Sequence, residues 1–107
     1  MRKVELLQAH KHSYKTRSEV LLSETCGCFF CLRTFKPALI TDWVDETDDG
    51  VGQTALCPYC GIDAVIGDRS GFAIDPEFLA QMQSFWFTRS KPQRFAREFF
   101  KPLYRRK

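Results

Sequence analysis

The apolar pattern is strongest between residues 75 and 87, where it predicts an amphipathic helix. Large apolar side chains recur there at i, i+1, i+4, i+7 and i+8, positions that share one helical face: Phe78, Leu79, Met82, Phe85 and Trp86. The preceding Asp75-Pro76-Glu77 supplies an N-cap, a proline at the first helical position and an acid near the positive end of the helix dipole. We therefore expect a helix to begin after Asp75 and to cover the core.

Two weaker helical patterns lie in the N-terminal quarter of the chain. Residues 2–12 predict a short helix with little amphipathic character, and residues 17–24 predict a second one. Thr16 and Glu19 have the spacing of a capping box, in which each side chain accepts a hydrogen bond from a free backbone N–H at the start of the helix. The residues of the second helix that we expect to face the core are Val20 and Leu21.

Between the N-terminal helices and the helix predicted at residues 75–87, the pattern changes to short strands and turns. Residues 62–66 alternate and predict a strand, with one face formed by Ile62, Ala64 and Ile66. Residues 36–43 predict one or two helical turns opened by Pro37. Residues 45–53 are acidic and contain two glycines, so they predict an exposed loop. Together these elements indicate a small α+β fold with an antiparallel sheet.

A second amphipathic pattern begins after Ser90. Its apolar stripe is formed by Phe95, Phe99, Phe100, Leu103 and Tyr104. The opposite face is basic and carries Arg94, Arg97, Lys101, Arg105 and Arg106. We therefore divide the chain into one domain over residues 1–90 and a basic amphipathic tail over residues 91–107, kinked or ended near Pro102. This tail either packs on its own domain or docks on a partner.

The charge is unevenly distributed along the chain. The formal net charge is +3, yet residues 18–87 hold three basic and eleven acidic side chains. Residues 1–17 carry five basic side chains against one acidic, and residues 88–107 carry eight against one. A zinc ion bound by four thiolates would add about −2 to the middle segment. An acidic domain thus lies between two basic ends, which restricts the partners more than the net charge does.

Length and composition indicate one small globular domain that stays in the cytoplasm. The chain has 107 residues, of which 44% are hydrophobic. No apolar run reaches the roughly 18–20 residues that cross a bilayer. The charged N-terminus lacks the apolar stretch of a signal peptide. In a reducing cytoplasm, paired cysteines more often bind a metal than form disulfides.

Four cysteines in two CxxC pairs carry the chemistry that the sequence predicts. Cys28 and Cys31 form one pair and Cys57 and Cys60 the other, with twenty-five residues between the pairs. Each turn directs two sulfurs to one side, and four thiolates bind a tetrahedral Zn²⁺ at roughly 2.3 Å. Four protein ligands leave no position for a catalytic water, so we expect one structural zinc ion and no enzyme activity. The fold expected around it is a small zinc ribbon of antiparallel β-hairpins with flanking helices.

The two CxxC pairs differ in the residue that follows them, which bears on whether the two turns have the same backbone conformation. Gly61 follows the second pair, where a positive φ is often needed and glycine adopts it without strain. Leu32 stands at the matching place after the first pair. The first turn therefore either holds a strained leucine or follows a different backbone path.

Other potential ligands have simpler interpretations. Cys26 either competes for the metal or remains beside it as a spare, buried thiol, and we favour the second interpretation. His10 and His12 are two residues apart and do not share a helix face, so we expect them to be solvated. The aspartates between residues 42 and 75 lack the spacing of a calcium loop, and we assign them to turns, caps and solubility.

The sequence supports three functions in decreasing order. The first is a binding module for a macromolecule, a protein above all, because ten phenylalanines and two tryptophans exceed what a small core needs. The second is nucleic-acid binding, in which the basic side chains of the tail contact phosphates and its aromatic rings stack on bases. The third is a thiol redox sensor, in which oxidation of Cys26 with Cys28 ejects the metal. No nucleophile–base set or glycine-rich phosphate loop favours an enzyme.

The chain resembles a group of small bacterial proteins labelled "cytoplasmic protein". The resemblance rests on CGCFFC, a DW dipeptide, TALCPYCGIDAVIGD, SGF and DPEFL with a following FWF, and it extends from about His12 to Phe87. It implies a bacterial or phage origin, a cytosolic location and a zinc ribbon that uses Cys28, Cys31, Cys57 and Cys60. It implies no particular activity. The chain departs from the group after Thr88, where its basic tail begins.

Overall fold

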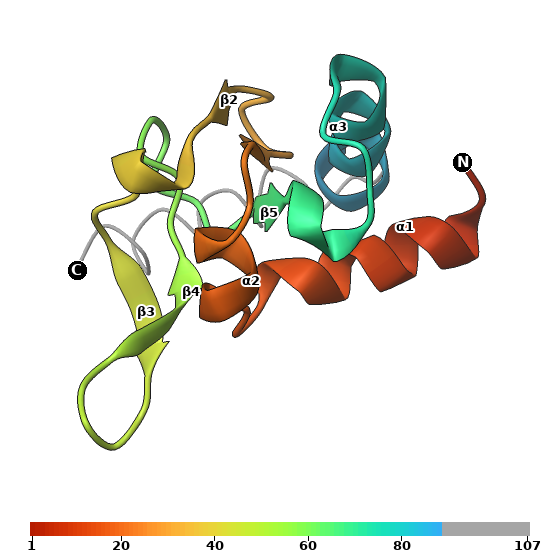
Figure 1. Cartoon of the computed structure of the whole chain (residues 1–107). Helices are drawn as coiled ribbons and strands as arrows, with labels where there is room; N and C mark the ends of the chain where they lie inside the picture. The colour runs from red at the N-terminus through yellow and green to blue at the C-terminus, as the bar shows by residue number, and fades with distance from the viewer. Residues whose placement is uncertain (89–107) are drawn as a thin grey trace.

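The computed structural model describes residues 1–88, in which helices pack around a three-stranded antiparallel sheet and a two-stranded antiparallel hairpin lies to one side (Figure 1). The helices are α1 (Lys3–His10), α2 (Arg17–Leu21) and α3 (Pro76–Gln83). The strands are β1 (Cys26–Cys28), β2 (Thr34–Phe35), β3 (Trp43–Glu46), β4 (Gly52–Ala55) and β5 (Val65–Gly67). Short 3₁₀ turns form η1 (Lys11–Ser13), η2 (Pro37–Leu39) and η3 (Asp68–Ser70), and a π-helical turn, η4 (Ser84–Thr88), follows α3. The predicted α+β class is confirmed.

The strand β1 is the centre of a three-stranded sheet with the order β2-β1-β5. Cys26 pairs with Phe35 of β2 and with Gly67 of β5, and Cys28 pairs with Val65. The strands β3 and β4 form a separate hairpin that extends away from the helices (Figure 1). The first CxxC turn therefore lies within the β1–β2 hairpin, whereas the second joins β4 to β5, two strands of different sheets. A zinc ribbon is expected to have one hairpin around each CxxC turn. The first turn lies in such a hairpin, whereas the second does not.

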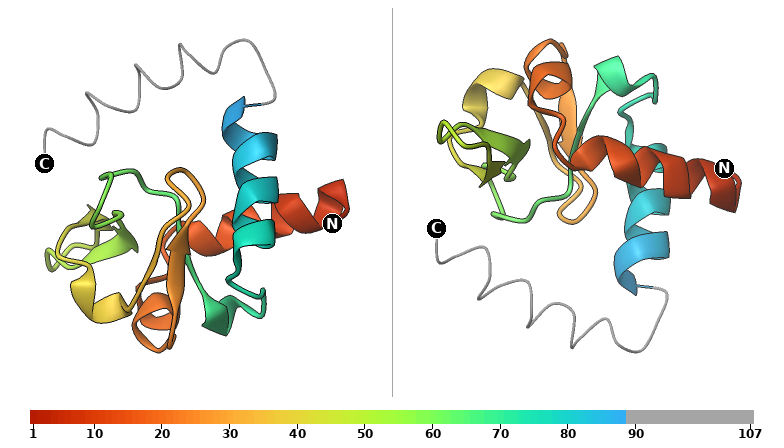
Figure 2. Two further views of the ribbon diagram at one scale, coloured as in Figure 1. Left: turned by 90° about the horizontal axis from the view of Figure 1, so that it is seen from above. Right: turned by 90° about the horizontal axis from the view of Figure 1, so that it is seen from below.

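The helix α3 begins where the sequence predicts. The Phe78 N–H donates to Asp75 Oδ1 at 2.8 Å, and a proline occupies the first turn. The buried residues of α3 are Phe78, Leu79 and Met82. With η4 it lies across α1, as both views of Figure 2 show, and the Trp86 indole N–H donates to the carbonyl of Leu6 at 3.4 Å. The N-terminal helix and α3 thus cover the same side of the domain.

The capping box predicted for α2 is wrong. Thr16 makes no side-chain cap bond, and its hydroxyl donates instead to the carbonyl of His12 at 2.9 Å. The Glu19 carboxylate lies 2.9 Å from His12 Nδ1. The side chains of Thr16 and Glu19 therefore both interact with His12 in the preceding turn. These interactions compete with capping of the helix. Val20 is buried as predicted, but Leu21 is 47% exposed because the helix ends at this residue and turns one side to the core.

The region after β2 differs most from the sequence prediction. Of the helical turns predicted over residues 36–43, only the 3₁₀ turn η2 is present, and Trp43 begins the strand β3. The loop predicted over residues 45–53 is shortened, because its two ends belong to β3 and β4. The Arg17 guanidinium lies 4.5 Å from the centre of the Trp43 ring, and its Nη1 donates to the carbonyl of Gly52 at 2.7 Å. These contacts from α2 hold both strands, and no local pattern encodes them.

The strand predicted over residues 62–66 is present as β5 but is shifted toward the C-terminus. Ile62 and Ala64 are buried as predicted, while pairing with β1 begins at Val65. The alternation of the segment places Val65, with Asp63, on the face opposite Ile62, Ala64 and Ile66, yet Val65 is 1% exposed. The reason is that α2 and η1 both contact β5, so that neither face of this strand meets solvent.

Candidate metal centre

Four cysteine sulfurs converge between the two CxxC turns. The Sγ atoms of Cys28, Cys31, Cys57 and Cys60 all lie within 4.8 Å of one another. The Cys28–Cys60 and Cys31–Cys57 sulfur pairs are each 3.7 Å apart. Sulfurs at the corners of a tetrahedron around zinc, with bonds of about 2.3 Å, lie about 3.8 Å apart. The four residues predicted from the sequence are thus brought together, and their spacing and donor chemistry fit a tetrahedral metal ion.

The two turns have the same backbone hydrogen bonds. In the first, the Leu32 N–H donates to the carbonyl of Cys28 at 2.8 Å; in the second, the Gly61 N–H donates to the carbonyl of Cys57 at 2.9 Å. Both residues have positive φ, 69° for Leu32 and 81° for Gly61. The first turn therefore does not follow a different path. Leu32 holds a left-handed conformation that costs about 1–2 kcal/mol for a residue with a side chain.

We expect Gly61→Ala to lower the free energy of unfolding by about 1 kcal/mol. A Cβ atom at this position would meet no other atom within 4 Å, so the cost comes from the positive φ and not from a clash. Thermal unfolding of the metal-loaded protein measures the cost, and metal content is expected to stay unchanged. Unaltered stability would show that the turn can adopt another backbone conformation at residue 61 without cost.

Backbone N–H groups within each turn point at its first sulfur. The N–H groups of Phe30 and Cys31 lie 3.4 and 3.5 Å from Cys28 Sγ, and the Tyr59 N–H lies 3.3 Å from Cys57 Sγ. Such donors stabilise the negative charge of a metal-bound thiolate and fix its orientation. The turns are therefore shaped for deprotonated sulfur.

Hydrogen bonds between the crowded sulfurs shift the pKa values of the cysteines. Hydrogen bonding from Cys28 lowers the pKa of Cys31 to about 7, and hydrogen bonds from Cys28 and then Cys60 lower the pKa of Cys57 to about 2. The pKa of Cys28 itself is strongly raised, because its side chain bonds to the other three and is buried. Four neighbouring thiolates repel one another unless a cation lies between them, and a metal ion supplies that charge as it displaces the protons.

One side of the cluster reaches the surface. Cys28 and Cys57 are buried, whereas Cys31 and Cys60 are half-buried. Tyr59, at the tip of the second turn, is 50% exposed, and the Arg33 guanidinium lies 4.8 Å from the centre of its ring. A metal ion can therefore enter from this side without opening the core.

Cys26 lies outside the sulfur cluster. It is fully buried on β1, where its Sγ lies 3.9 Å from the carbonyl of Val20. Burial, and then the negative charge of Asp68, raises the pKa of Cys26 to about 12. The interpretation of Cys26 as a buried cysteine apart from the metal is confirmed.

We expect Cys26→Ala to keep the metal. The substitution removes one buried sulfur that does not belong to the group of four, so metal content stays at that of the wild type and stability falls by about 1 kcal/mol. Elemental analysis of protein purified under reducing conditions measures the ratio of metal to chain. Loss of the metal from this variant would mean that Cys26 is a ligand.

The two histidines take no part in the cluster, and the expectation that both are solvated is wrong. The His10 ring packs against Trp86 and Phe29, with ring centres 4.0 and 5.9 Å apart. His12 pairs with Glu19. Burial lowers the pKa of His10, and the negative charge of Asp63 opposes this effect. The helical spacing of His10 and the buried Leu6 places both on the inner side of α1, a signal that the sequence contains.

We expect His10 to make stability fall in acid. Its folded pKa is lower than the unfolded value of 6.5, so the unfolded chain takes up the proton more readily. Its contribution is complete above pH 6.5 and is lost as the pH falls through the folded pKa. Urea unfolding across this range should give a steeper decline for the wild type than for His10→Gln. Parallel curves for the two proteins would contradict the prediction.

Asp49 and Asp68 accept hydrogen bonds in turns and loops, and Asp75 caps α3, as the sequence predicts. Asp49 accepts a hydrogen bond from the Thr47 hydroxyl, which lowers the pKa of Asp49. Asp68 Oδ1 accepts the N–H of Glu24 at 3.1 Å. Within residues 1–88, the four cysteines are the one group of histidine, cysteine and acidic side chains arranged to hold a metal ion.

Comparison of the chain with family models, curated proteins and solved structures found no match. None of the helices among residues 1–88 is long and apolar enough to cross a membrane. The basic residues that the sequence nominates for partner contact, Arg94, Arg97, Lys101, Arg105 and Arg106, lie outside the described residues. Function is therefore inferred from the geometry of the sulfur cluster and of its surroundings.

Proposed function

We propose that the protein is a small structural-zinc module that binds another macromolecule, a protein in the first instance. The observation that carries this proposal is the group of four cysteine sulfurs within 4.8 Å of one another. Four thiolates complete the coordination of zinc and leave no position for a reacting water. The metal then serves the fold, and function belongs to the surfaces that the metal holds in place.

Zinc is the metal that best suits this ligand set. Thiolates are soft ligands, and tetrahedral sulfur sites hold zinc or iron. Elemental analysis of protein purified under reducing conditions is expected to give one zinc ion per chain. Iron bound by the same sulfurs would absorb visible light, so a coloured protein with stoichiometric iron would replace zinc in the proposal.

Exposed leucines on the surface of the domain support the proposal that its partner is a protein. Leu21 and Leu22 at the end of α2 are 47% and 64% exposed, and Leu39 of η2 is 48% exposed. The elements α2 and η2 contact each other, so these exposed leucines belong to neighbouring elements of the fold. Exposed apolar side chains that gather on one surface are typical of a protein interface.

A pair of charge substitutions tests the protein-binding role. We expect the double variant Leu22→Arg/Leu39→Arg to keep its zinc and to lose a partner that cross-links to the wild type in the host. Leu7→Arg is the matched control, because Leu7 is also exposed, at 40%, but lies on α1. Equal capture of the partner by all three proteins would exclude this surface.

Nucleic-acid binding through the basic tail is the alternative that the sequence favours. The described part of the chain disfavours it, because residues 1–88 carry eight basic and twelve acidic side chains. Binding through the tail would be tolerant of sequence and would weaken steeply as salt rises. Gel shifts at low salt that are lost on substitution of Arg94, Arg97 and Arg105 would make this alternative the function.

A further inference from the structure

The four sulfurs of the cluster differ in their access to solvent. Cys31 and Cys60 are half-buried, whereas Cys28 and Cys57 are buried. The two half-buried cysteines belong to different turns, one from each CxxC pair. A small molecule that reaches the cluster from the surface therefore meets the sulfur of Cys31 or of Cys60 first. Thiolates that are accessible in this way are the ones that oxidants attack.

Each half-buried sulfur has a buried sulfur of the other turn beside it. Cys31 Sγ lies 3.7 Å from Cys57 Sγ, and Cys60 Sγ lies 3.7 Å from Cys28 Sγ. A disulfide bond is about 2.05 Å long, so each of these pairs needs to close by about 1.7 Å. Rotation of cysteine side chains supplies a movement of this size without a change of fold.

We propose that hydrogen peroxide converts the metal site into two disulfides that cross between the turns, Cys31–Cys57 and Cys28–Cys60, and that these bonds link the turns in place of the metal. This inference rests on the proposed function, because it requires the cluster to hold a structural zinc ion. The half-buried cysteine of each pair is the sulfur that peroxide attacks, and the buried cysteine completes the disulfide. Peroxide is small and uncharged, so the charge of about −2 on a zinc ion with four thiolates does not repel it.

The reaction of one pair begins when the Cys31 thiolate attacks an oxygen atom of peroxide. The O–O bond breaks, a sulfenic acid forms on the sulfur, and hydroxide leaves and takes up a proton. The Cys57 thiolate then attacks that sulfur, so that an S–S bond forms, the S–O bond breaks and a second hydroxide leaves as water. Each disulfide thus takes two electrons from two thiolates and converts one peroxide and two protons into two waters. Cys60 and Cys28 react with a second peroxide in the same way, and Zn²⁺, left without thiolate ligands, passes into solvent.

The pairing across the turns determines whether the oxidised domain stays folded. The Cys31–Cys57 bond would join positions 26 apart, and the Cys28–Cys60 bond would join positions 32 apart. Cross-links over such separations remove much of the conformational freedom of the unfolded chain. A disulfide within one CxxC pair would join positions three apart and would leave the two turns unconnected. Cross-turn disulfides can therefore replace the metal as a link, whereas in-turn disulfides cannot.

Cys26 lies apart from this chemistry. It is fully buried, and its Sγ lies 3.9 Å from the carbonyl of Val20. Because β1 is extended, the Cα atoms of Cys26 and Cys28 are about 6.6 Å apart. Most disulfides join Cα atoms about 5.5–6 Å apart. The oxidised pair that the sequence suggests, Cys26 with Cys28, is therefore replaced in this proposal by Cys60 with Cys28, and Cys26 remains a free thiol.

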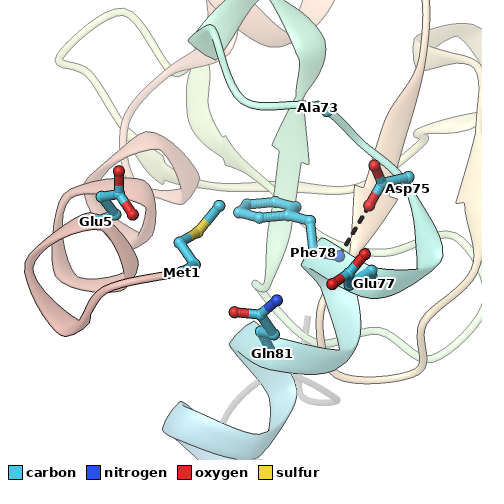
Figure 3. Close-up of a pocket in the computed structure, with 7 residues that line it drawn as sticks. All are labelled: Met1, Glu5, Ala73, Asp75, Glu77, Phe78 and Gln81. Carbon is cyan, nitrogen blue, oxygen red and sulfur yellow. Dashed lines mark hydrogen bonds between the residues drawn. The ribbon is translucent and has the colours of Figure 1, made fainter.

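Peroxide also reaches a sulfur outside the cluster. Met1 is 52% exposed and lines a hollow of about 270 Å³, in which its side chain points toward the ring of Phe78 (Figure 3). This hollow lies between the start of α1 and the start of α3. Conversion of Met1 to its sulfoxide adds an oxygen atom but consumes no thiol and no metal ligand. The number of free thiols, rather than the mass of the intact chain, therefore measures the reaction at the cluster.

The test uses the full-length protein, loaded with zinc under reducing conditions, and hydrogen peroxide as the oxidant. A chromogenic indicator should report release of the bound zinc. The chain has five cysteines, so the number of thiols alkylated after denaturation should fall from five to one. Cys26→Ala is the matched control, because it should release its zinc equally and its thiols should fall from four to none.

Peptide mapping without reduction distinguishes the two kinds of disulfide. Cleavage by trypsin after Arg33 places the first turn on residues 18–33 and the second on residues 34–69. Cross-turn disulfides should link these two peptides, whereas in-turn disulfides would leave them separate. Chymotrypsin then separates the cysteines of each turn, since Phe30 lies within the first pair and Tyr59 within the second. The fragments should show Cys31 joined to Cys57 and Cys28 joined to Cys60.

Circular dichroism tests whether the disulfides replace the metal. The oxidised, zinc-free protein should keep a cooperative melting transition, whereas reduced protein stripped of zinc by a chelator should have none. Reduction with dithiothreitol in the presence of zinc should restore the original melt and the metal content.

Four outcomes would overturn the proposal. They are retention of zinc at peroxide concentrations that oxidise Met1, disulfides within one turn, a disulfide that contains Cys26, and an unfolded protein after the cross-turn disulfides have formed. Each of these is measured on protein that contains zinc at the start, so each leaves the proposed function standing. Absence of zinc from the reduced, purified protein would instead remove the proposed function and this inference with it.

Discussion

Cys57→Ala is expected to lose the metal and to unfold at the temperature where the wild type is folded. A structural zinc site contributes on the order of 10 kcal/mol to folding. The net stability of a small domain is about 5–15 kcal/mol, so removal of one ligand cancels most of it. Cys57 is 3% exposed and stands where β4 leads into the second turn, and its sulfur is one of the four that form the cluster. Elemental analysis and circular dichroism melts measure the two effects.

Cys26→Ala is the matched control for this prediction, because it also removes a buried cysteine near the cluster. The contrast between the two variants separates metal binding from the general cost of a smaller core residue. Addition of a strong chelator to the wild type should reproduce the melt of Cys57→Ala. If Cys57→Ala melts as the wild type does and retains its metal, the four-cysteine site is not what holds the domain together.

The features that the sequence predicts well are those that short segments encode alone. Each CxxC turn closes within a few residues, so its two sulfurs are directed to one side whatever surrounds it. The same holds for α3, whose start depends on Asp75 and the N–H of Phe78, three residues away. The positive φ of Gly61 is equally local, since the turn itself requires it.

The features that the sequence misses depend on contacts between distant residues. The β3–β4 hairpin is held by Arg17, which bonds to Gly52 across thirty-five positions of the chain. Thr16 and Glu19 fit a capping box by spacing, yet His12 occupies both. His10 is predicted to be solvated; its spacing from Leu6 indicates the inner side of α1, but the ring that packs on it, Trp86, comes from the far end of the domain. A pocket lined by residues that include His10, Phe29, Asp63 and Phe87 likewise takes its lining from four separate segments, so no short stretch of the sequence contains it.

Leu79→Ala is expected to lower the free energy of unfolding by about 3 kcal/mol. Leu79 is fully buried on α3 and lies against Gly27 of β1, next to Cys28 of the sulfur cluster. Its removal leaves an apolar cavity between the helix and the central strand, while the sulfur cluster keeps its ligands. The metal-loaded variant should melt about 15 °C below the wild type and retain its metal. Leu22→Ala, at a site that is 64% exposed, should change stability by about 0.5 kcal/mol or less.

Gly27 makes the role of Leu79 testable by a double-mutant cycle. A Cβ atom on Gly27 would lie 2.8 Å from Ile74 Cγ2 and 3.0 Å from Leu79 Cδ1, so Gly27→Ala alone should destabilise the domain through overpacking. When Leu79 is also alanine, the added methyl group enters the space that the leucine has left. The combined variant should therefore lose less stability than the two single losses added together. Strict additivity would show that α3 does not rest on β1 through this contact, and that the strand holding Cys28 is supported by other parts of the core.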